Sequence, residues 1–259
     1  MHKKGGSIHY MNKKTILITG ATSGVGLLIA KLCIEKQYDV YVTGRNVESL
    51  RELQTLGAHA IQADIRSKQE VDQLIEMLPS LDVAILNAGL GIFEAAHDLK
   101  DEEVQEMFDV NVLAPIYLAR KIAPKMMQQQ KGHFIFMSSQ AGKVATKKAS
   151  VYAASKHAIT GFINGFRLEV ADANIHVTGI YPGPIDTPFL QKADAAGAYR
   201  EAIKKFLLKP EQVANAVMNA IEHPRREVNL PKVMGLTSKL YAIAPSVIEF
   251  FGKGFFNKK

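Results

Sequence analysis

Short apolar runs alternate with longer amphipathic stretches along most of this 259-residue chain. Short runs rich in β-branched residues are typical of buried strands, and apolar positions that recur every three or four residues are typical of helices. Seven strands are predicted, at residues 15–19, 39–43, 59–63, 83–86, 132–137, 176–181 and 227–230. Helical stretches separate them. This alternation predicts an α/β fold, a single doubly wound domain whose mostly parallel sheet has helices on both faces.

A turn of three glycines follows the first strand, in the sequence TILITGATSGVG. Gly20 allows a tight turn, Gly24 lets the backbone approach a ligand, and Gly26 lets the next helix pack closely on the strand. Thr22 and Ser23 place hydroxyls at the helix N-terminus, where unpaired N–H groups favour an anion. The turn therefore predicts a pyrophosphate site, although a tight strand-to-helix turn without a ligand would have the same glycines.

Arg45 follows the second strand, at the position where an NAD-binding unit usually carries an acidic residue for the adenosine ribose. A guanidinium can pair with a phosphate through two hydrogen bonds, whereas a carboxylate would repel it. Arg45 therefore favours NADP over NAD. The alternative is that Arg45 is a solvated turn residue.

Two further strand ends carry polar or small residues. Asp64 and Ile65 follow the third strand, and Asp64 could also cap the helix that starts near Ser67. The tripeptide Asn87-Ala88-Gly89 follows the fourth strand, and its small size leaves room for a sugar or ring at the carboxyl edge of the sheet. Without a ligand it would be an ordinary loop.

Residues 101–130 are predicted to form one long helix that contains Asn111 and Pro115. Pro115 has no N–H to donate, so the carbonyl of Asn111 loses its helical partner. A buried free carbonyl needs another partner, and water is the simplest one. Asn111 is therefore either a helix-kink residue or the holder of an ordered water.

Tyr152 and Lys156 are four residues apart in a predicted helix, so they lie on one face and one turn from each other. A free tyrosine titrates near ~10, and a neighbouring ammonium would favour its anion. Ser139, at the end of the fifth strand, supplies a hydroxyl that could hold a substrate oxygen beside the phenol.

The glycine turn, Asn87-Ala88-Gly89, Asn111, Ser139 and the Tyr152/Lys156 pair occur together in one chain. This combination resembles the short-chain dehydrogenase/reductase family, over roughly residues 13–188. The resemblance implies a Rossmann fold in which Tyr152 is the general acid or base and Lys156 lowers its pKa and binds the nicotinamide ribose. It also implies that Ser139 orients the substrate carbonyl and that Asn111 supports the proton relay through a water.

The resemblance also implies a cofactor site for NADP, with NAD less favoured, and no metal. Asp64 would bond the adenine amino group, and the backbone near Ile185 and the hydroxyl of Thr187 would hold the nicotinamide carboxamide. The predicted cofactor-binding residues are Gly20, Thr22, Ser23, Gly24, Val25, Gly26, Arg45, Asp64, Ile65, Asn87, Ala88, Gly89, Tyr152, Lys156, Pro182, Gly183, Ile185 and Thr187.

A lid over the substrate is predicted at residues 185–208, an amphipathic stretch in the position where the family covers its pocket. The predicted substrate contacts are Ser139, Ile92, Phe93, Val144 and Phe189. Their apolar character implies a hydrophobic pocket. Lys143, Lys147 and Lys148 are either a solvated group or a contact for an anionic substrate or acidic carrier protein.

Composition narrows the possible partners and locations. The net charge of +7 comes without an arginine-rich run or zinc-ligand spacing, so no nucleic-acid partner is expected. The chain has one cysteine, Cys33, and no long apolar run, which predicts a reducing, cytoplasmic setting. Residues 1–12 are predicted to be a disordered extension, 13–235 the catalytic domain, and 236–259 a hydrophobic tail of the same domain. Packing of this tail on its own domain or a second subunit is favoured over peripheral membrane contact, because Pro245 and Glu249 interrupt a lipid face.

The sequence thus predicts an NADP-dependent carbonyl reductase that acts reversibly on a hydrophobic ketone, aldehyde or alcohol. A 3-oxoacyl-[acyl carrier protein] reductase is the enzyme alternative, and a non-catalytic NADP-binding sensor or scaffold is the alternative of another class. The glycine spacing disfavours a sugar-nucleotide epimerase. Apolar and small residues on several faces of the helix after Tyr152 predict a homodimer or homotetramer.

Overall fold

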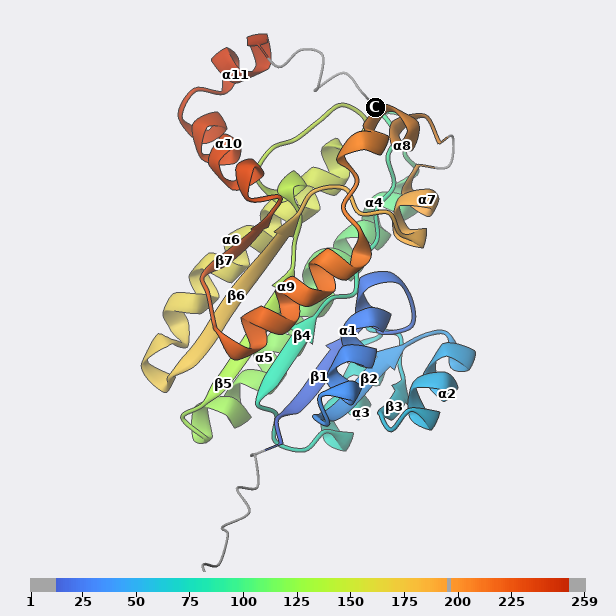
Figure 1. Cartoon of the computed structure of the whole chain (residues 1–259), viewed down its shortest axis with the longest axis vertical. Helices are drawn as coiled ribbons and strands as arrows, with labels where there is room; N and C mark the ends of the chain where they lie inside the picture. Colours follow the sequence, from blue (N-terminus) through green and yellow to red (C-terminus); the bar gives the residue numbers. More distant parts are fainter. Residues whose placement is uncertain (1–12, 195–196, 252–259) are drawn as a thin grey trace, which may run out of the picture.

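The computed structural model describes residues 13–194 and 197–251, and within them a seven-stranded parallel sheet forms the centre (Figure 1). The strands are β1 (Thr15–Thr19), β2 (Asp39–Gly44), β3 (His59–Gln62), β4 (Val83–Leu86), β5 (Gly132–Met137), β6 (Ile175–Pro182) and β7 (Glu227–Leu230). Their order is β3-β2-β1-β4-β5-β6-β7, and every neighbouring pair is parallel. The predicted doubly wound Rossmann fold is confirmed, with a sheet that is wholly parallel.

Helices cover both faces of the sheet and bury two apolar layers. One layer contains α1 (Gly24–Glu35), α2 (Val47–Thr55) and α9 (Pro210–Glu222), and the other contains α3 (Lys68–Met77), α5 (Ala114–Gln128) and α6 (Ser150–Glu169). Alternating side chains on a strand point to opposite faces. In β1, Ile16 and Ile18 accordingly join the first layer, and Leu17 joins the second.

The helical stretch predicted at residues 101–130 consists of three pieces. α4 (Asp101–Phe108) leads into a π-helical turn, Asp109–Leu113, and then into α5. The N–H of Ala114 bonds to the carbonyl of Asp109, five residues back. A wider turn of this kind fits the position just before Pro115, which cannot donate to Asn111. The helical run ends at Gln128 rather than at residue 130.

The predicted lid region consists of α7 (Pro188–Ala193) and α8 (Ala198–Ile203). Its base is closed by a bridge between Ile185 and Leu208, and the N–H of Phe93 bonds to the carbonyl of Ala193 at 2.8 Å. The lid is therefore tied both to the strand end it leaves and to the loop after β4.

The last described elements are α10 (Lys232–Ile243) and α11 (Pro245–Phe251), which project from the same end of the molecule as the lid (Figure 1). The predicted disordered extension at 1–12 and the last part of the predicted tail, 252–259, lie outside the described residues. Within the described ranges, no helix has both the length and the apolar character needed to span a bilayer.

Candidate functional site

A cavity of about 1090 Å³ opens at the carboxyl ends of the strands. β1 lies between β2 and β4, so the chain winds away from β1 in opposite directions on its two sides. Doubly wound sheets bind ligands at this kind of switch point. All the predicted cofactor-binding residues contribute to the cavity lining.

The glycine turn is shaped by close contact with the loop after β4. Gly20 has a φ of 65°, and a Cβ there would lie 2.7 Å from the Cα of Ala88. A methyl group at Gly26 would overlap the carbonyl oxygen of Gly20 and Nδ2 of Asn87. Asn87 Nδ2 donates to the carbonyls of Thr19 at 3.1 Å and Gly20 at 3.2 Å. Asn87 therefore fixes the two loops together.

The start of α1 fits the pyrophosphate of a dinucleotide. Ser23 is the N-cap residue, but its side chain makes no capping hydrogen bond, and the first turn contains no acidic residue. The first N–H groups of α1 and the positive end of its dipole thus face the cavity without a competing carboxylate. Gly24 lies against Thr187, since a Cβ at Gly24 would be 3.6 Å from that side chain, and the neighbouring segment carries Pro182, Gly183 and Ile185.

The far end of the cavity carries two arginines, Arg45 after β2 and Arg66 after β3. Arg66 Nη2 lies 2.5 Å from Oδ2 of Asp64, and Arg66 Nη1 lies 2.7 Å from Oε1 of Glu106. The hydrogen bonds from Arg66 hold the pKa of the Asp64 carboxyl below its ordinary value. The helix after β3 is capped by Ser67, which accepts from the N–H of Glu70, so the proposed capping role of Asp64 was wrong.

Sequence reasoning missed Arg66. An aspartate and an arginine two residues apart at a strand end could have indicated a local ion pair. The second partner, Glu106, lies 40 residues away on α4, and no sequence signal connects it to this site.

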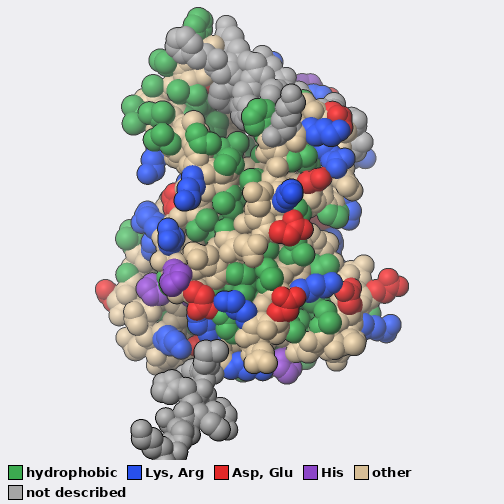
Figure 2. Space-filling view, viewed as in Figure 1, with side chains coloured by type: hydrophobic (Ala, Val, Ile, Leu, Met, Phe, Trp, Pro, Cys, Tyr) green, Lys and Arg blue, Asp and Glu red, His purple; other side chains and the backbone are tan. Residues whose placement is uncertain are grey.

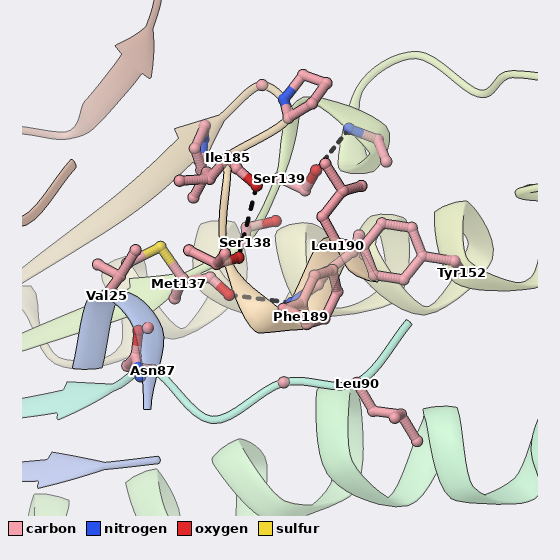
Figure 3. Close-up of a pocket in the computed structure, with 18 of the residues that line it drawn as sticks. Val25, Asn87, Leu90, Met137, Ser138, Ser139, Tyr152, Ile185, Phe189 and Leu190 are labelled. Atoms are coloured by element: carbon pink, nitrogen blue, oxygen red, sulfur yellow. Dashed lines mark hydrogen bonds between the residues drawn. The ribbon is translucent and has the colours of Figure 1, made fainter. Parts of the chain in front are cut away.

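Tyr152 and Lys156 are both buried on α6, facing the loop after β5. Lys156 Nζ lies 5.8 Å from the centre of the Tyr152 ring and donates to the carbonyl of Met137 at 3.1 Å. Ser139 lies on that loop, and its Oγ accepts from the N–H of Ala141 at 3.0 Å. Figure 3 shows Ser139 and Tyr152 on neighbouring walls of the cavity.

Burial favours the neutral form of both side chains. It raises the pKa of Tyr152 to about 12, while a hydrogen bond with Ser139 acts in the opposite direction. It lowers the pKa of Lys156 to about 8. The pKa of Tyr152 is therefore not brought toward neutrality in this structure, unlike the expectation from its pairing with Lys156. Desolvation is the largest influence on the pKa of each group.

Asn111 does not line the cavity but supports its floor from the π-helical turn. Its Oδ1 accepts from the N–H of Leu90 at 2.9 Å. Its Nδ2 donates to the carbonyl of Leu90 at 2.7 Å and to Oγ of Ser155 at 3.0 Å. Asn111 thus connects the loop after β4 to α6, three residues beyond Tyr152.

Aromatic rings surround Tyr152 on the substrate side. The ring of Phe93 lies 5.5 Å from those of Tyr152 and Tyr199, and the ring of Phe189 lies 6.0 Å from that of Tyr152. Phe93, Phe189 and Val144 all line the cavity, whereas Ile92 lies outside the lining. The predicted hydrophobic pocket is thus assembled, without Ile92.

Part of the lining was not predicted from the sequence. It comes from α10 and α11, more than 80 residues beyond Tyr152 in the chain, through Val233, Met234, Thr237, Tyr241 and Ile248. The aromatic and aliphatic residues of the tail are evident in the sequence, but their position in the cavity lining depends on the fold.

Lys143 does not belong to the pocket rim. Its Nζ lies 2.6 Å from Oε2 of Glu227 and 3.0 Å from Oδ1 of Asn229, over the ring of Tyr181. An ammonium with these partners is not available to a carrier protein. Lys147 and Lys148 are exposed.

Comparisons with known proteins agree with this geometry. The family model described as "short chain dehydrogenase" matches residues 14–197. The chain belongs to the short-chain dehydrogenase/reductase family.

Other members of the short-chain dehydrogenase/reductase family resemble it over most of their length. An uncharacterized oxidoreductase of Staphylococcus aureus strain USA300 is 32% identical over 231 residues, which cover 86% of this chain and 96% of the relative. The closed form of a serine dehydrogenase complexed with NADP+ has a TM-score of 0.78 at 30% identity, covering 83% of this chain and 93% of the other. A 4-hydroxyisoleucine dehydrogenase complexed with NADH has a TM-score of 0.75 at 26% identity, covering 81% and 91%. The protein is therefore an oxidoreductase with a dinucleotide-binding fold.

Proposed function

We propose that the protein transfers a hydride between NADPH and the carbonyl carbon of a hydrophobic ketone or aldehyde, and acts reversibly on the matching alcohol. One observation carries this proposal: the start of α1 and the side chains of Ser139 and Tyr152 line the same cavity. A dinucleotide whose pyrophosphate is held at α1 would reach toward the phenol, across the carboxyl ends of β1, β4, β5 and β6.

Bound NADPH supplies the hydride that reduces the carbonyl carbon. Residues of the chain orient the substrate and supply the proton. The Ser139 hydroxyl donates a hydrogen bond to the substrate oxygen, and Tyr152 gives that oxygen its proton. A phenol whose pKa is raised to about 12 is protonated at neutral pH, which suits a proton donor. Lys156 holds the ribose on the same face of α6, and Asn111 keeps the loop after β4 in place.

NADP is proposed over NAD because of Arg45. It is exposed and lines the cavity directly after β2, at the position where an NAD-binding unit usually carries an acidic residue for the ribose. The solved relatives include one complex with NADP+ and one with NADH, so the preference rests on this chain's own arginine.

The substrate is proposed to be hydrophobic because the rings of Phe93 and Phe189 lie against that of Tyr152, and Tyr199 lies against Phe93. A 3-oxoacyl group delivered by an acyl carrier protein is less well supported, since Lys143 is engaged by Glu227. A sensor without turnover would have no use for a buried phenol and ammonium beside a serine hydroxyl. A homo-oligomer and a reducing, cytoplasmic location complete the proposal, the latter supported by Cys33 being the chain's single cysteine.

A spectrophotometric screen tests the function. Purified protein should oxidise NADPH in the presence of some members of a panel of apolar ketones and aldehydes. Tyr152→Phe should lower kcat by about 10²–10⁴-fold while NADPH affinity, measured by fluorescence titration, stays within a few-fold. Full activity of Tyr152→Phe would refute the assigned proton donor. NADPH binding without turnover of any substrate would favour the sensor.

A further inference from the structure

The outer side of α10 and α11 carries a line of exposed apolar side chains. They recur every three or four residues, and their exposed fractions are 61% for Val233, 61% for Leu236, 48% for Leu240, 82% for Ile243 and 53% for Val247. These five residues are here named the C-terminal apolar face. Figure 2 shows hydrophobic side chains gathered at the upper left, where Figure 1 places α10 and α11.

Packing among the described residues does not explain this face. In α10 the buried residues are Gly235 and Ser238, both small, so the helix buries little of its apolar surface against the domain. Apart from Phe250 on α11, the other large apolar side chains that are well exposed in the described residues are scattered over the rest of the chain, as Leu56 and Met77 are. A concentrated, exposed apolar surface marks a site of interaction.

The charge around the face favours an anionic partner. Residues 231–259 contain five lysines and one glutamate, which gives this segment +4 of the chain's +7. The glutamate, Glu249, accepts a hydrogen bond from Tyr241 Oη at 2.7 Å. A second copy of the chain would bring the same positive charge against the face, whereas anionic lipid headgroups would complement it. We propose that the C-terminal apolar face docks on the surface of an anionic lipid bilayer.

Docking of this face would bring the cavity to the lipid. The same two helices form both surfaces. Met234, Thr237, Tyr241 and Ile248 line the cavity, Val233 belongs to both surfaces, and the other four residues of the C-terminal apolar face lie outside the cavity lining. If the proposed function holds, a hydrophobic carbonyl compound dissolved in the bilayer reaches Tyr152 along α10 without crossing water. The docking itself does not depend on that function.

Cosedimentation with vesicles tests the docking on the full chain. The wild type should sediment with vesicles of phosphatidylcholine and phosphatidylglycerol in equal parts, and much less with phosphatidylcholine alone. Raised salt should weaken the binding, because screening reduces the attraction between lysines and headgroups. The triple variant Leu236→Ser, Leu240→Ser, Ile243→Ser should lower the partition coefficient at least about tenfold, since three apolar side chains no longer enter the interface.

A matched control is Leu56→Ser, Met77→Ser, Met127→Ser, which removes three exposed apolar side chains elsewhere and should partition like the wild type. NADPH oxidation without vesicles, measured on all three proteins, reports separately on the proposed function. Docking is refuted if the wild type stays in the supernatant with anionic vesicles, or if the two triple variants bind equally. If the wild type does not bind vesicles, and the mass of the first triple variant in light scattering differs from that of the wild type, the C-terminal apolar face instead contacts a second copy of the chain.

Discussion

Burial raises the pKa of Tyr152 and lowers that of Lys156, so it disfavours the charged form of each side chain. With a pKa of about 8, Lys156 is still protonated at neutral pH, and its buried ammonium lowers the stability of the fold. An ammonium removed from water is stabilised only by the groups around it. Lys156 Nζ has the Met137 carbonyl at 3.1 Å as its hydrogen-bond partner. The turn of α6 that carries both side chains is therefore expected to be less stable than the same turn with an apolar residue at 156.

Lys156→Met should raise stability at neutral pH while lowering activity. The pKa of Lys156 falls from 10.5 to about 8 in the fold. Below pH 8, Lys156 is protonated in both the folded and the unfolded protein, so burying its charge lowers the free energy of unfolding by the full amount. Between pH 8 and 10.5, Lys156 loses its proton in the folded protein but keeps it in the unfolded protein. The free energy of unfolding of the wild type therefore rises with pH relative to that of the variant. The variant should be more stable by about 1–3 kcal/mol at pH 7, and the difference should shrink above pH 8.

Urea unfolding at several pH values measures this difference. Lys147→Met, which removes an exposed lysine from the loop before α6, should leave the pH dependence unchanged. A variant less stable than the wild type at neutral pH would mean that the ammonium contributes more through its bonds than it loses by burial.

Arg45 decides the cofactor if the proposal is right. Arg45→Gln removes a charge that would bond the 2′-phosphate, and a hydrogen bond to a charged group contributes about 1.5–3 kcal/mol. The ratio kcat/KM for NADPH should therefore fall about 10- to 100-fold, with the value for NADH nearly unchanged. Arg51→Gln, an exposed arginine on α2, is the control. An equal loss with both cofactors would show that Arg45 does not recognise the phosphate.

At the scale of elements, the strand ends form a single site because parallel strands end at one edge. The glycine turn and the Tyr152/Lys156 pair could be predicted because each motif lies within a dozen residues. The Arg66–Glu106 ion pair and the contribution of α10 to the cavity could not, since they join segments that only the fold brings together. The π-helical turn at Asp109–Leu113 could be predicted in part. Pro115 indicates that the regular helix is interrupted, but it does not indicate that the interruption takes the form of a π-helical turn.

Gly26→Ala tests the packing between the glycine turn and the loop after β4. The added methyl would overlap the Gly20 carbonyl and Nδ2 of Asn87, neither of which is the free end of a flexible side chain. The free energy of unfolding should fall by about 1–3 kcal/mol, as for other overpacked sites, and NADPH affinity should fall with it. Lys31→Ala, on the outer side of α1, should change stability by no more than about 1 kcal/mol. Wild-type stability and affinity in Gly26→Ala would show that the turn is looser than the structure indicates.

At the scale of the molecule, one side of α6 is left uncovered by the described residues. Gly161 and Gly165 are exposed, with Leu168 beyond them 74% exposed, and a Cβ at either glycine would meet none of the described atoms within 4 Å. Within one chain, larger residues would therefore fit at both positions. Glycines on an exposed helix side are more readily explained by a second helix that approaches closely. This surface belongs to α6, whereas the C-terminal apolar face belongs to α10 and α11, so substitutions can test the two contacts independently.

Gly165→Arg should therefore change the assembly rather than the fold. Light scattering on the wild type should give a multiple of the 28.5 kDa chain mass, and the variant should shift toward 28.5 kDa. Its free energy of unfolding at low concentration should not fall by more than about 0.5 kcal/mol, because the side chain points into open space in the monomer. Gln54→Arg, which adds the same charge on α2, should keep the wild-type mass. A wild type found at 28.5 kDa alone would leave the glycines of α6 without a partner and would refute the predicted oligomer.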